Sequence, residues 1–267
     1  LNAEVKTYKM VFVPASEKGD ESDYTSLIAI TEKITGLNID TIKVTDYNAA
    51  VEAMRAGRAH IAWFGGKTYV KAVEIANAEA FAAGVRPGEK DAGYYAYFVV
   101  KNDSSLKKFE DIKGKILSLN TIGSTSGDLI PQVELNKISL SIKNKTHFKN
   151  VFYAGSHDAC LLAVLNNQSD VCGMSSRNFE ARLEDGTFKK EDVRIIHKSD
   201  RVPPPPLAYS KMILKEDRDK IKKAVLEAHK HGEIGGYGGK MSHYTEVKDS
   251  DYNVLREVIE LLNKNKG

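Results

Sequence analysis

The sequence predicts an α/β protein of two similar lobes, each with a mixed, mainly parallel sheet flanked by helices. Two observations point to this fold class. An internal repeat aligns residues 46–63 with residues 156–173 without a gap, at a constant offset (156 − 46 = 110). A strand, a loop and a helix also precede each copy in the same order. Alternation of strands and helices is typical of sheets with parallel strands.

Each copy of the repeat has the pattern of a capped helix followed by a strand. Asp46 and Ser156 are good N-cap residues, and apolar residues follow them at helical spacing. Gly57 and Asn167 are residue types that end helices in the left-handed conformation. The apolar stretches HIAWF and DVCGM that follow are expected as buried strands. Chance likeness of two helix–strand units is the alternative, and the gapless agreement disfavours it.

The elements before each repeat copy are predicted in the same way. In the first half, a strand over residues 9–14 leads through a polar loop to a helix over 24–35. In the second half, a strand over 115–120 leads through the loop TIGSTSG to a helical segment over 128–137.

Two extended segments are expected to connect the lobes. Residues 93–103 have the pattern of a strand, and residues 201–209 contain four consecutive prolines, which favour a stiff extended chain. We therefore expect a discontinuous first lobe, made of residues 1–99 and 206–267, and a second lobe made of residues 100–205.

The remaining C-terminal part is expected to be mostly helical. Residues 215–230 and 252–264 have apolar residues at helical spacing, and a glycine-rich loop over 232–239 separates them. This part is expected to pack on the first lobe.

Composition narrows the classes of protein. The 267 residues are 42% apolar and 28% charged, with 39 Lys and Arg against 36 Asp and Glu, a net charge of +3. This content of apolar residues argues against disorder, and the mixed, nearly balanced charges argue against nucleic acid as a partner. No apolar run approaches the ~20 residues that span a bilayer. No signal peptide is visible in the chain, and a removed one would leave no trace.

The two cysteines, Cys160 and Cys172, provide neither a disulfide framework nor a metal site. Each lies among apolar neighbours, so buried free thiols are favoured over a bridge between them.

The strongest candidate for a binding site is the loop Gly123–Gly127, which follows a predicted strand and opens a predicted helix. Ser124, Thr125 and Ser126 offer three hydroxyl groups, and the unpaired N–H groups of a helix N-terminus favour an anion. The sequence thus predicts a cradle for a small tetrahedral anion. An ordinary Ser/Thr helix cap is the alternative, and it accounts for one hydroxyl better than for three.

Three aromatic side chains are further candidates. Tyr47 and His157 occupy equivalent positions in the repeat, one residue after the N-cap, so each lobe is expected to aim one ring donor at a ligand between the lobes. Taken singly, either residue could be structural. Trp63, the only tryptophan, ends the strand of the first repeat copy and is expected either to line the cleft or to fill the core.

Several catalytic sites are disfavoured. The run GGYGGKM lacks the spacing of a phosphate-binding P-loop, and IGSTSGD is not a nucleophile elbow. Ser126, His157 and Asp158 are residue types of a hydrolytic triad, but adjacent residues of a helix do not face each other. His229, His231 and His243 have no diagnostic metal-site spacing. We expect no enzyme activity, no metal and no cofactor.

Four stretches of the chain resemble one known family. They are VTDYNAAVEAMRAGRAHIAWFG, AGYYAYFVVKNDSSLKKFEDIKGK, the STSG loop with LIP after it, and AGSHDACLLAV…SDV. Together with the C-terminal YTEVKDSDYNVLREV, they resemble the phosphonate-type (PhnD-type) substrate-binding proteins of ABC transporters. The resemblance covers most of the chain and implies a two-lobed periplasmic binding protein of type II.

The resemblance also implies roles for individual residues. Ser124, Thr125, Ser126 and His157 would hold the oxygens of the phosphorus group from the second lobe. Tyr47 and Tyr94 would close over them from the first lobe. Trp63 or either tyrosine could provide an apolar wall for a substituent other than oxygen.

Two departures from the family pattern bear on the ligand. Members that bind aminoalkylphosphonates have carboxylates where this chain has Arg177 and Pro205. Loss of two charge-assisted hydrogen bonds, at ~1.5–3 kcal/mol each, would weaken binding of an ammonium group by a hundredfold or more. Phosphite, hypophosphite or methylphosphonate are therefore expected, and phosphate would bury one unpaired oxygen at ~1–3 kcal/mol.

The sequence thus predicts a monomeric periplasmic solute-binding protein that captures such an anion by hinge closure and delivers it to membrane permease subunits. Its signal peptide is expected to have been removed, with a lipid anchor as an option. An aminoalkylphosphonate-binding protein is the first alternative. The ligand-sensing domain of a receptor with the same fold is the second.

Overall fold

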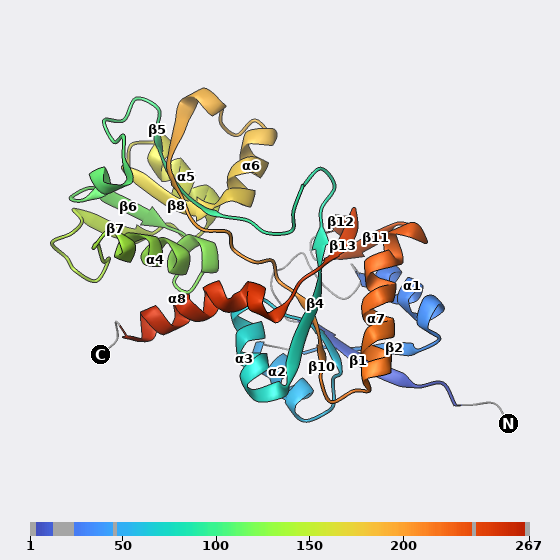
Figure 1. Cartoon of the computed structure of the whole chain (residues 1–267). Helices are drawn as coiled ribbons and strands as arrows, with labels where there is room; N and C mark the ends of the chain where they lie inside the picture. Colours follow the sequence, from blue (N-terminus) through green and yellow to red (C-terminus); the bar gives the residue numbers. More distant parts are fainter. Residues whose placement is uncertain (1–3, 13–23, 45–46, 237–238, 265–267) are drawn as a thin grey trace. The chain divides into compact units, whose positions relative to one another are not determined.

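In the computed structural model, the chain divides into two compact units, each built around one main sheet (Figure 1). The structure describes residues 4–12, 24–44, 47–236 and 239–264. Unit 1 comprises Leu1–Ala92 and Pro203–Arg256, and unit 2 comprises Gly93–Val202 and Glu257–Gly267. Within the described ranges, no helix is both long enough and apolar enough to cross a bilayer.

Unit 1 contains a six-stranded mixed sheet with the strand order β13-β4-β10-β3-β1-β2. β1 pairs in parallel with β2 and β3, whereas β10 pairs antiparallel with β3 and β4, and β13 antiparallel with β4. In Figure 1, β10 is drawn in orange among strands coloured blue to teal, because it comes from the later part of the chain. The elements are β1 (Thr7–Phe12), α1 (Thr25–Thr35), β2 (Asn38–Ile42), α2 (Tyr47–Arg55), β3 (Ile61–Trp63), α3 (Gly66–Ala76), β4 (Ala78–Val85), β10 (Leu207–Ser210), α7 (Lys215–Glu227), β11 (Ile234–Gly236), β12 (Gly239–Met241) and β13 (His243–Glu246).

Unit 2 contains a five-stranded mixed sheet with the order β7-β6-β8-β5-β9. Here β6 pairs in parallel with β7 and β8, and β5 pairs antiparallel with β8 and β9. The elements are β5 (Ala96–Lys101), β6 (Ile116–Leu119), α4 (Ile130–Lys137), β7 (Asn150–Tyr153), α5 (His157–Leu165), β8 (Val171–Ser175), α6 (Ser176–Glu184) and β9 (Val193–Lys198). The last helix, α8 (Asn253–Lys264), begins in unit 1 and ends in unit 2.

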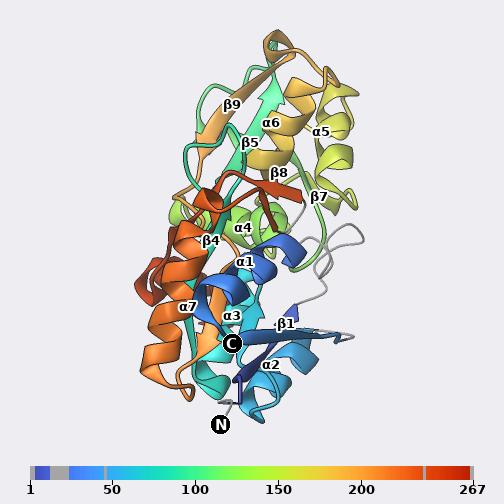
Figure 2. The same cartoon turned by 90° about the vertical axis from the view of Figure 1, so that its right-hand side faces the viewer.

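Alternation along β5 explains why helices cover both faces of the unit 2 sheet. Phe98 and Val100 belong to one buried cluster, which includes Leu135 of α4. Val99, between them in sequence, belongs to a second cluster with residues of α5 and α6, among them Phe179. Successive side chains of a strand point to opposite faces, so a continuous apolar run requires cover on both sides. Figure 2 shows α5 and α6 together on one side of this sheet.

The predicted repeat is confirmed in detail. Helices α2 and α5 both span nine residues and begin 110 positions apart (157 − 47), as do strands β3 and β8 (171 − 61). Gly57 and Asn167 both have positive φ, 77° and 59°, as a left-handed helix end requires. Ser156 caps α5 by accepting a hydrogen bond from Ala159 N at 3.0 Å. Asp46 lies outside the described residues.

The other predicted elements are found with shifted ends. The strand expected over 9–14 is β1, the segment over 24–35 is α1, and the segment over 215–230 is α7 followed by a short turn. Residues 13 and 14 lie outside the described part. The lobe boundaries expected after residues 99 and 205 stay a prediction.

Two expectations are wrong. The glycine-rich loop over 232–239 is partly a hairpin of β11 and β12. Glycine is needed there because β11 lies against Tyr244, whose hydroxyl donates to Gly235 O at 2.9 Å and would lie 2.3 Å from a Cβ on Gly236.

The second correction concerns the cysteines, which are not free thiols. Cys160 of α5 and Cys172 of β8 form a disulfide, with their Cα atoms 5.6 Å apart. The apolar surroundings were correctly recognised, because both residues are fully buried. The packing of α5 on β8, which brings the two sulfurs together, is a tertiary feature.

Candidate functional site

The loop that follows β6 in unit 2 forms the N-terminus of a helix, as expected. A π-helical turn over Thr125–Leu129 leads directly into α4. Ser124 is the N-cap, and its Oγ accepts from Gly127 N at 3.2 Å and from the Asn120 amide at 3.2 Å. The first N–H groups of a helix have no partner within the helix, so the loop presents donors and the positive end of a helix dipole.

Glycine is required at position 127 by close approach. A Cβ there would lie 2.3 Å from Cβ of Asn120 and 3.0 Å from Cε1 of His157. The His157 ring therefore lies directly against the Ser124–Gly127 loop, which we call the cradle. Two segments of unit 2 that are 30 residues apart (157 − 127) are brought together as the sequence predicted.

His157 is held as a neutral hydrogen-bond donor. It is the first residue of α5, and its Nδ1 accepts from Ser175 N at 3.1 Å. Because Nδ1 accepts, the ring proton is on Nε2, which is left to donate. Burial lowers the pKa of His157 to about 4, so the ring is uncharged at neutral pH.

Tyr94 links the cradle to a positive charge. Its side chain is hydrogen-bonded to Ser126, and the Arg177 guanidinium carbon lies 5.0 Å from the centroid of its ring. Burial raises the pKa of the Tyr94 hydroxyl, and the Arg177 charge and the Ser126 hydrogen bond act against this rise. Arg177 lies in the first turn of α6, where Ser175 Oγ accepts from its backbone N–H at 3.2 Å.

Sequence patterns did not identify a buried carboxylate that is hydrogen-bonded to the start of the cradle loop. Asp128, 2% exposed, accepts from Gly123 N at 2.7 Å, from the Gln132 amide at 2.7 Å and from the Tyr153 hydroxyl at 2.9 Å. It fixes Gly123, whose φ is 87°, and thereby the start of the loop. An acidic residue in the first turn of a helix was the available signal, because carboxylates favour that position.

The two candidates in unit 1 are placed differently. Trp63 ends β3 and is 6% exposed, with its ring centroid 6.5 Å from that of Tyr24. This burial fits the core alternative, and a role in lining a cleft stays a prediction. Tyr47 is the first residue of α2, as the repeat requires, and its side chain lies outside the described part.

The arrangement in unit 2 suits a small oxyanion. Hydroxyl groups, helix N–H groups and the Nε2–H of His157 are all donors. The helices that begin at Thr125 and at His157 follow β6 and β7, at the carboxyl edge of the sheet where ligands of α/β proteins bind. Among the described residues, no cluster of three or more His, Cys, Asp or Glu side chains has the arrangement of a metal site.

Comparison with known proteins identifies the family. The profile described as "ABC transporter, phosphonate, periplasmic substrate-binding protein" matches residues 10–252. The phosphonates-binding periplasmic protein of Escherichia coli is 29% identical over 214 residues, which cover 77% of this chain and 61% of that protein. The phosphate-import protein PhnD of Mycolicibacterium smegmatis is 26% identical over 98% of this chain and 87% of its own length.

A solved structure shows the same fold over nearly the whole chain. PhnD1 of Prochlorococcus marinus, in complex with methylphosphonate, superposes with a TM-score of 0.65 over 97% of this chain and 99% of its own, at 20% identity. The two-lobed architecture expected from the resemblance is thereby confirmed. The family consists of solute-binding proteins rather than enzymes. This chain belongs to the phosphonate-binding periplasmic substrate-binding proteins of ABC transporters.

Proposed function

We propose that this chain is the solute-binding component of an ABC transporter and captures a small phosphorus oxyanion: phosphite, hypophosphite or methylphosphonate. The observation that supports it most is the position of the neutral His157 ring against Gly127 of the cradle. The names of the relatives agree on phosphorus ligands and differ on which one.

The donors of unit 2 would hold the phosphorus-linked oxygens. The hydroxyls of Ser124, Thr125 and Ser126 and the first N–H groups of the helix surround one side of the anion. His157 adds its Nε2–H from α5. Neutral donors of this kind bind an anion without a large net charge on the protein, which agrees with the value of +3.

The position of Arg177 supports a ligand without an ammonium group. Its guanidinium lies over Tyr94, which is itself hydrogen-bonded to Ser126 of the cradle. A positive substituent on the ligand would meet a like charge near that point, and Pro205 offers no carboxylate to compensate. This disfavours aminoalkylphosphonates, the main alternative.

Closure of unit 1 over the loaded cradle is the second step of the proposal. The chain passes between the units three times: after Ala92, after Val202 and, within α8, after Arg256. The first two passages can act as a hinge. Tyr47 of unit 1 would complete the contacts, with Tyr94 from the first passage. Trp63 would be an apolar wall only if closure exposes it to the ligand.

The disulfide supports the proposed compartment. Disulfides such as Cys160–Cys172 form and persist in oxidising compartments, among them the bacterial periplasm. We infer that the mature protein works there as a monomer, after removal of a signal peptide or on a lipid anchor, and delivers its ligand to permease subunits.

Calorimetric titration of a panel of oxyanions tests the proposal. We expect the tightest ligand to be phosphite, hypophosphite or methylphosphonate. Phosphate should bind less tightly than that ligand, and aminoethylphosphonate at least a hundredfold less tightly. Tightest binding of aminoethylphosphonate would overturn the ligand assignment.

Variants of the cradle provide the matched test. His157→Ala and Ser126→Ala should each weaken binding of the tightest anion at least tenfold, because each removes a donor from a desolvated anion. Ser105→Ala, at an exposed serine of the same unit, should leave the affinity unchanged. Wild-type affinity in both cradle variants would remove the cradle from the site.

A further inference from the structure

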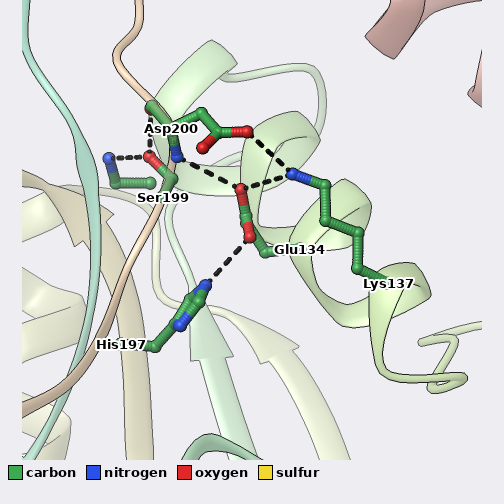
Figure 3. A network of polar contacts seen from close by, with 6 residues as sticks. Glu134, Lys137, His197, Ser199 and Asp200 are labelled. Carbon is green, nitrogen blue, oxygen red and sulfur yellow. Dashed lines mark hydrogen bonds and ion pairs between the residues drawn. The ribbon is translucent and has the colours of Figure 1, made fainter.

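A buried carboxyl group lies at the far end of the helix that begins at the cradle. Glu134 is in α4, and only 6% of its side chain is exposed. One of its oxygens is 2.9 Å from Nε2 of His197, and the other accepts from Nζ of Lys137 at 3.2 Å and from the backbone N–H of Asp200 at 3.4 Å. Figure 3 shows these donors approaching Glu134 from different sides.

His197 cannot turn away from Glu134 without losing a stacked contact. Its ring lies parallel to that of Phe109, with centroids 3.9 Å apart and an interplanar angle of 2°. Phe109 in turn packs against Phe98 of β5 within the core of unit 2. The ring that meets Glu134 is thus fixed by the core.

Asp200 belongs to the segment through which the chain leaves unit 2. Its neighbour Ser199 accepts from Ala96 N at 2.9 Å and donates to Asp200 O at 2.8 Å. Val202 and Tyr94 then form an isolated antiparallel bridge. Residues 94–96 and 199–202, which we call the crossover pair, are therefore one hydrogen-bonded unit that Glu134 joins to α4.

The same helix is joined to the crossover pair at its other end. Ser126 of the cradle is hydrogen-bonded to Tyr94, a member of that pair. Ser126 and Glu134 are eight residues apart, about 12 Å along a helix axis. The helix thus contacts the crossover pair twice, once beside the anion site and once at a buried carboxyl group.

We propose that Glu134 is a positioning residue that fixes the crossover pair against the cradle helix, so that the anion site and the chain passages move as one body. Only the binding measurement below rests on the proposed function, because the hydrogen-exchange measurement needs no ligand. Glu134 contacts no proposed ligand group, and Lys137 and Asp200 support it through their own ion pair at 3.0 Å.

Glu134→Gln tests this with little change of shape. A carboxylate accepts through both oxygens, whereas an amide has one acceptor and would direct its N–H₂ group at a donor. The negative charge paired with Lys137 is then lost. Nε2 of His197 keeps a hydrogen bond to the amide N–H₂ only if it changes from donor to acceptor. Glu184→Gln, the same change at an exposed residue of α6, is the matched control.

Amide hydrogen exchange of the ligand-free protein is the deciding measurement. In Glu134→Gln we expect exchange at least threefold faster at Ala96 and Val202 of the crossover pair. We expect the same at Gly127 of the cradle and at Leu129, which ends the π-helical turn, and no change in Glu184→Gln. Faster exchange confined to residues around position 134, or none at all, would overturn the inference.

Phosphite binding gives a second readout. The affinity of Glu134→Gln should fall three- to tenfold at a temperature where circular dichroism shows the variant folded, and unchanged affinity would contradict the inference. If the wild-type protein binds none of phosphite, hypophosphite and methylphosphonate, the proposed ligand fails while the exchange result still decides the inference. Should Glu134→Gln not fold, Lys137→Met, at a half-exposed side chain, should give the same exchange pattern with a smaller amplitude.

Discussion

The two copies of the repeat share a scaffold and differ in chemistry. The bond that ends α2, from Arg58 N to Ala53 O, is matched in α5 by Gln168 N to Ala163 O, both at 2.8 Å. The offset of 110 continues beyond the segment recognised in the sequence, because Gly65 before α3 corresponds to Ser175 before α6 (175 − 65).

The two copies differ beside His157 and at one pair of buried positions. Where unit 1 has Gly65, with no side-chain cap, unit 2 has Ser175, which caps α6 and donates its N–H to His157. Unit 2 has a disulfide where unit 1 has the buried Ala50 and Ala62 (160 − 50 = 172 − 62 = 110). One scaffold thus carries the proposed anion site and a disulfide in unit 2, and the buried Ala50 and Ala62 at the disulfide's equivalent positions in unit 1.

The largest difference to test is the disulfide. Unit 1 has alanine at both equivalent positions. Replacing Cys160 and Cys172 with alanine should therefore lower the free energy of unfolding of unit 2 by about 3 kcal/mol, the value expected for the short loop that this disulfide closes. The two cysteines are separated by 12 residues. Urea unfolding with a probe in each unit measures the effect.

The reciprocal substitution is its control. Ala50→Cys with Ala62→Cys should form a second disulfide in unit 1, which mass spectrometry detects as the loss of two further hydrogens. If the two cysteines stay reduced under oxidising conditions, the likeness of the two scaffolds does not extend to the spacing of helix and strand.

The second difference is a titrating group in only one copy. The pKa of His157 is about 4 in the folded protein against an ordinary value of 6.5, so the unfolded chain binds a proton more readily. Stability is therefore full above pH 6.5 and falls as the pH drops from 6.5 to 4, by up to about 1.4 kcal/mol per pH unit.

Unfolding of His157→Gln between pH 4 and 7 checks this expectation. The variant should have a shallower dependence of stability on pH than the wild type. His231→Gln, at an exposed histidine, serves as the control and should leave the dependence unchanged. An identical slope in His157→Gln and wild type would contradict the tautomer and burial described for His157.

The smallest expected effect concerns the residue that ends each repeat helix. Gly57→Asn and Asn167→Gly give each repeat helix the final residue of the other. Each should change the free energy of unfolding by less than about 1 kcal/mol, because both residue types adopt the left-handed conformation. Gly57→Ala should cost about 1–2 kcal/mol, through backbone strain alone, because no atom lies within 4 Å of the added Cβ. Denaturant midpoints distinguish the two kinds of substitution.

Local patterns in the sequence were sufficient for the repeat and for much of the site. Ser156, Asn167 and the hydroxyl-rich loop act through their immediate neighbours, so their roles follow from residue type and position. His157 was identified by its place in the repeat. Its tautomer was not, because that depends on Ser175 N, 18 residues away, and its low pKa was not, because that depends on burial.

What the sequence did not predict depends on contacts between distant segments. Pairing of Cys160 with Cys172 requires α5 to pack on β8, and the environment of Glu134 requires β9 and the crossover pair to meet α4. The antiparallel pairing of β11 with β12 needs glycine where Tyr244 lies against β11. In each case the sequence shows the residue type but does not show which distant residue it contacts in the folded chain.

The strand order has a consequence for synthesis of the chain. β10 lies between β3 and β4, yet it begins at Leu207, after all strands of unit 2. Until the ribosome has released that residue, the sheet of unit 1 has a gap at its centre, whereas unit 2 already has its five strands. Because domains fold as units during translation, we expect the sheet of unit 2, which carries the proposed anion site, to form before the sheet of unit 1.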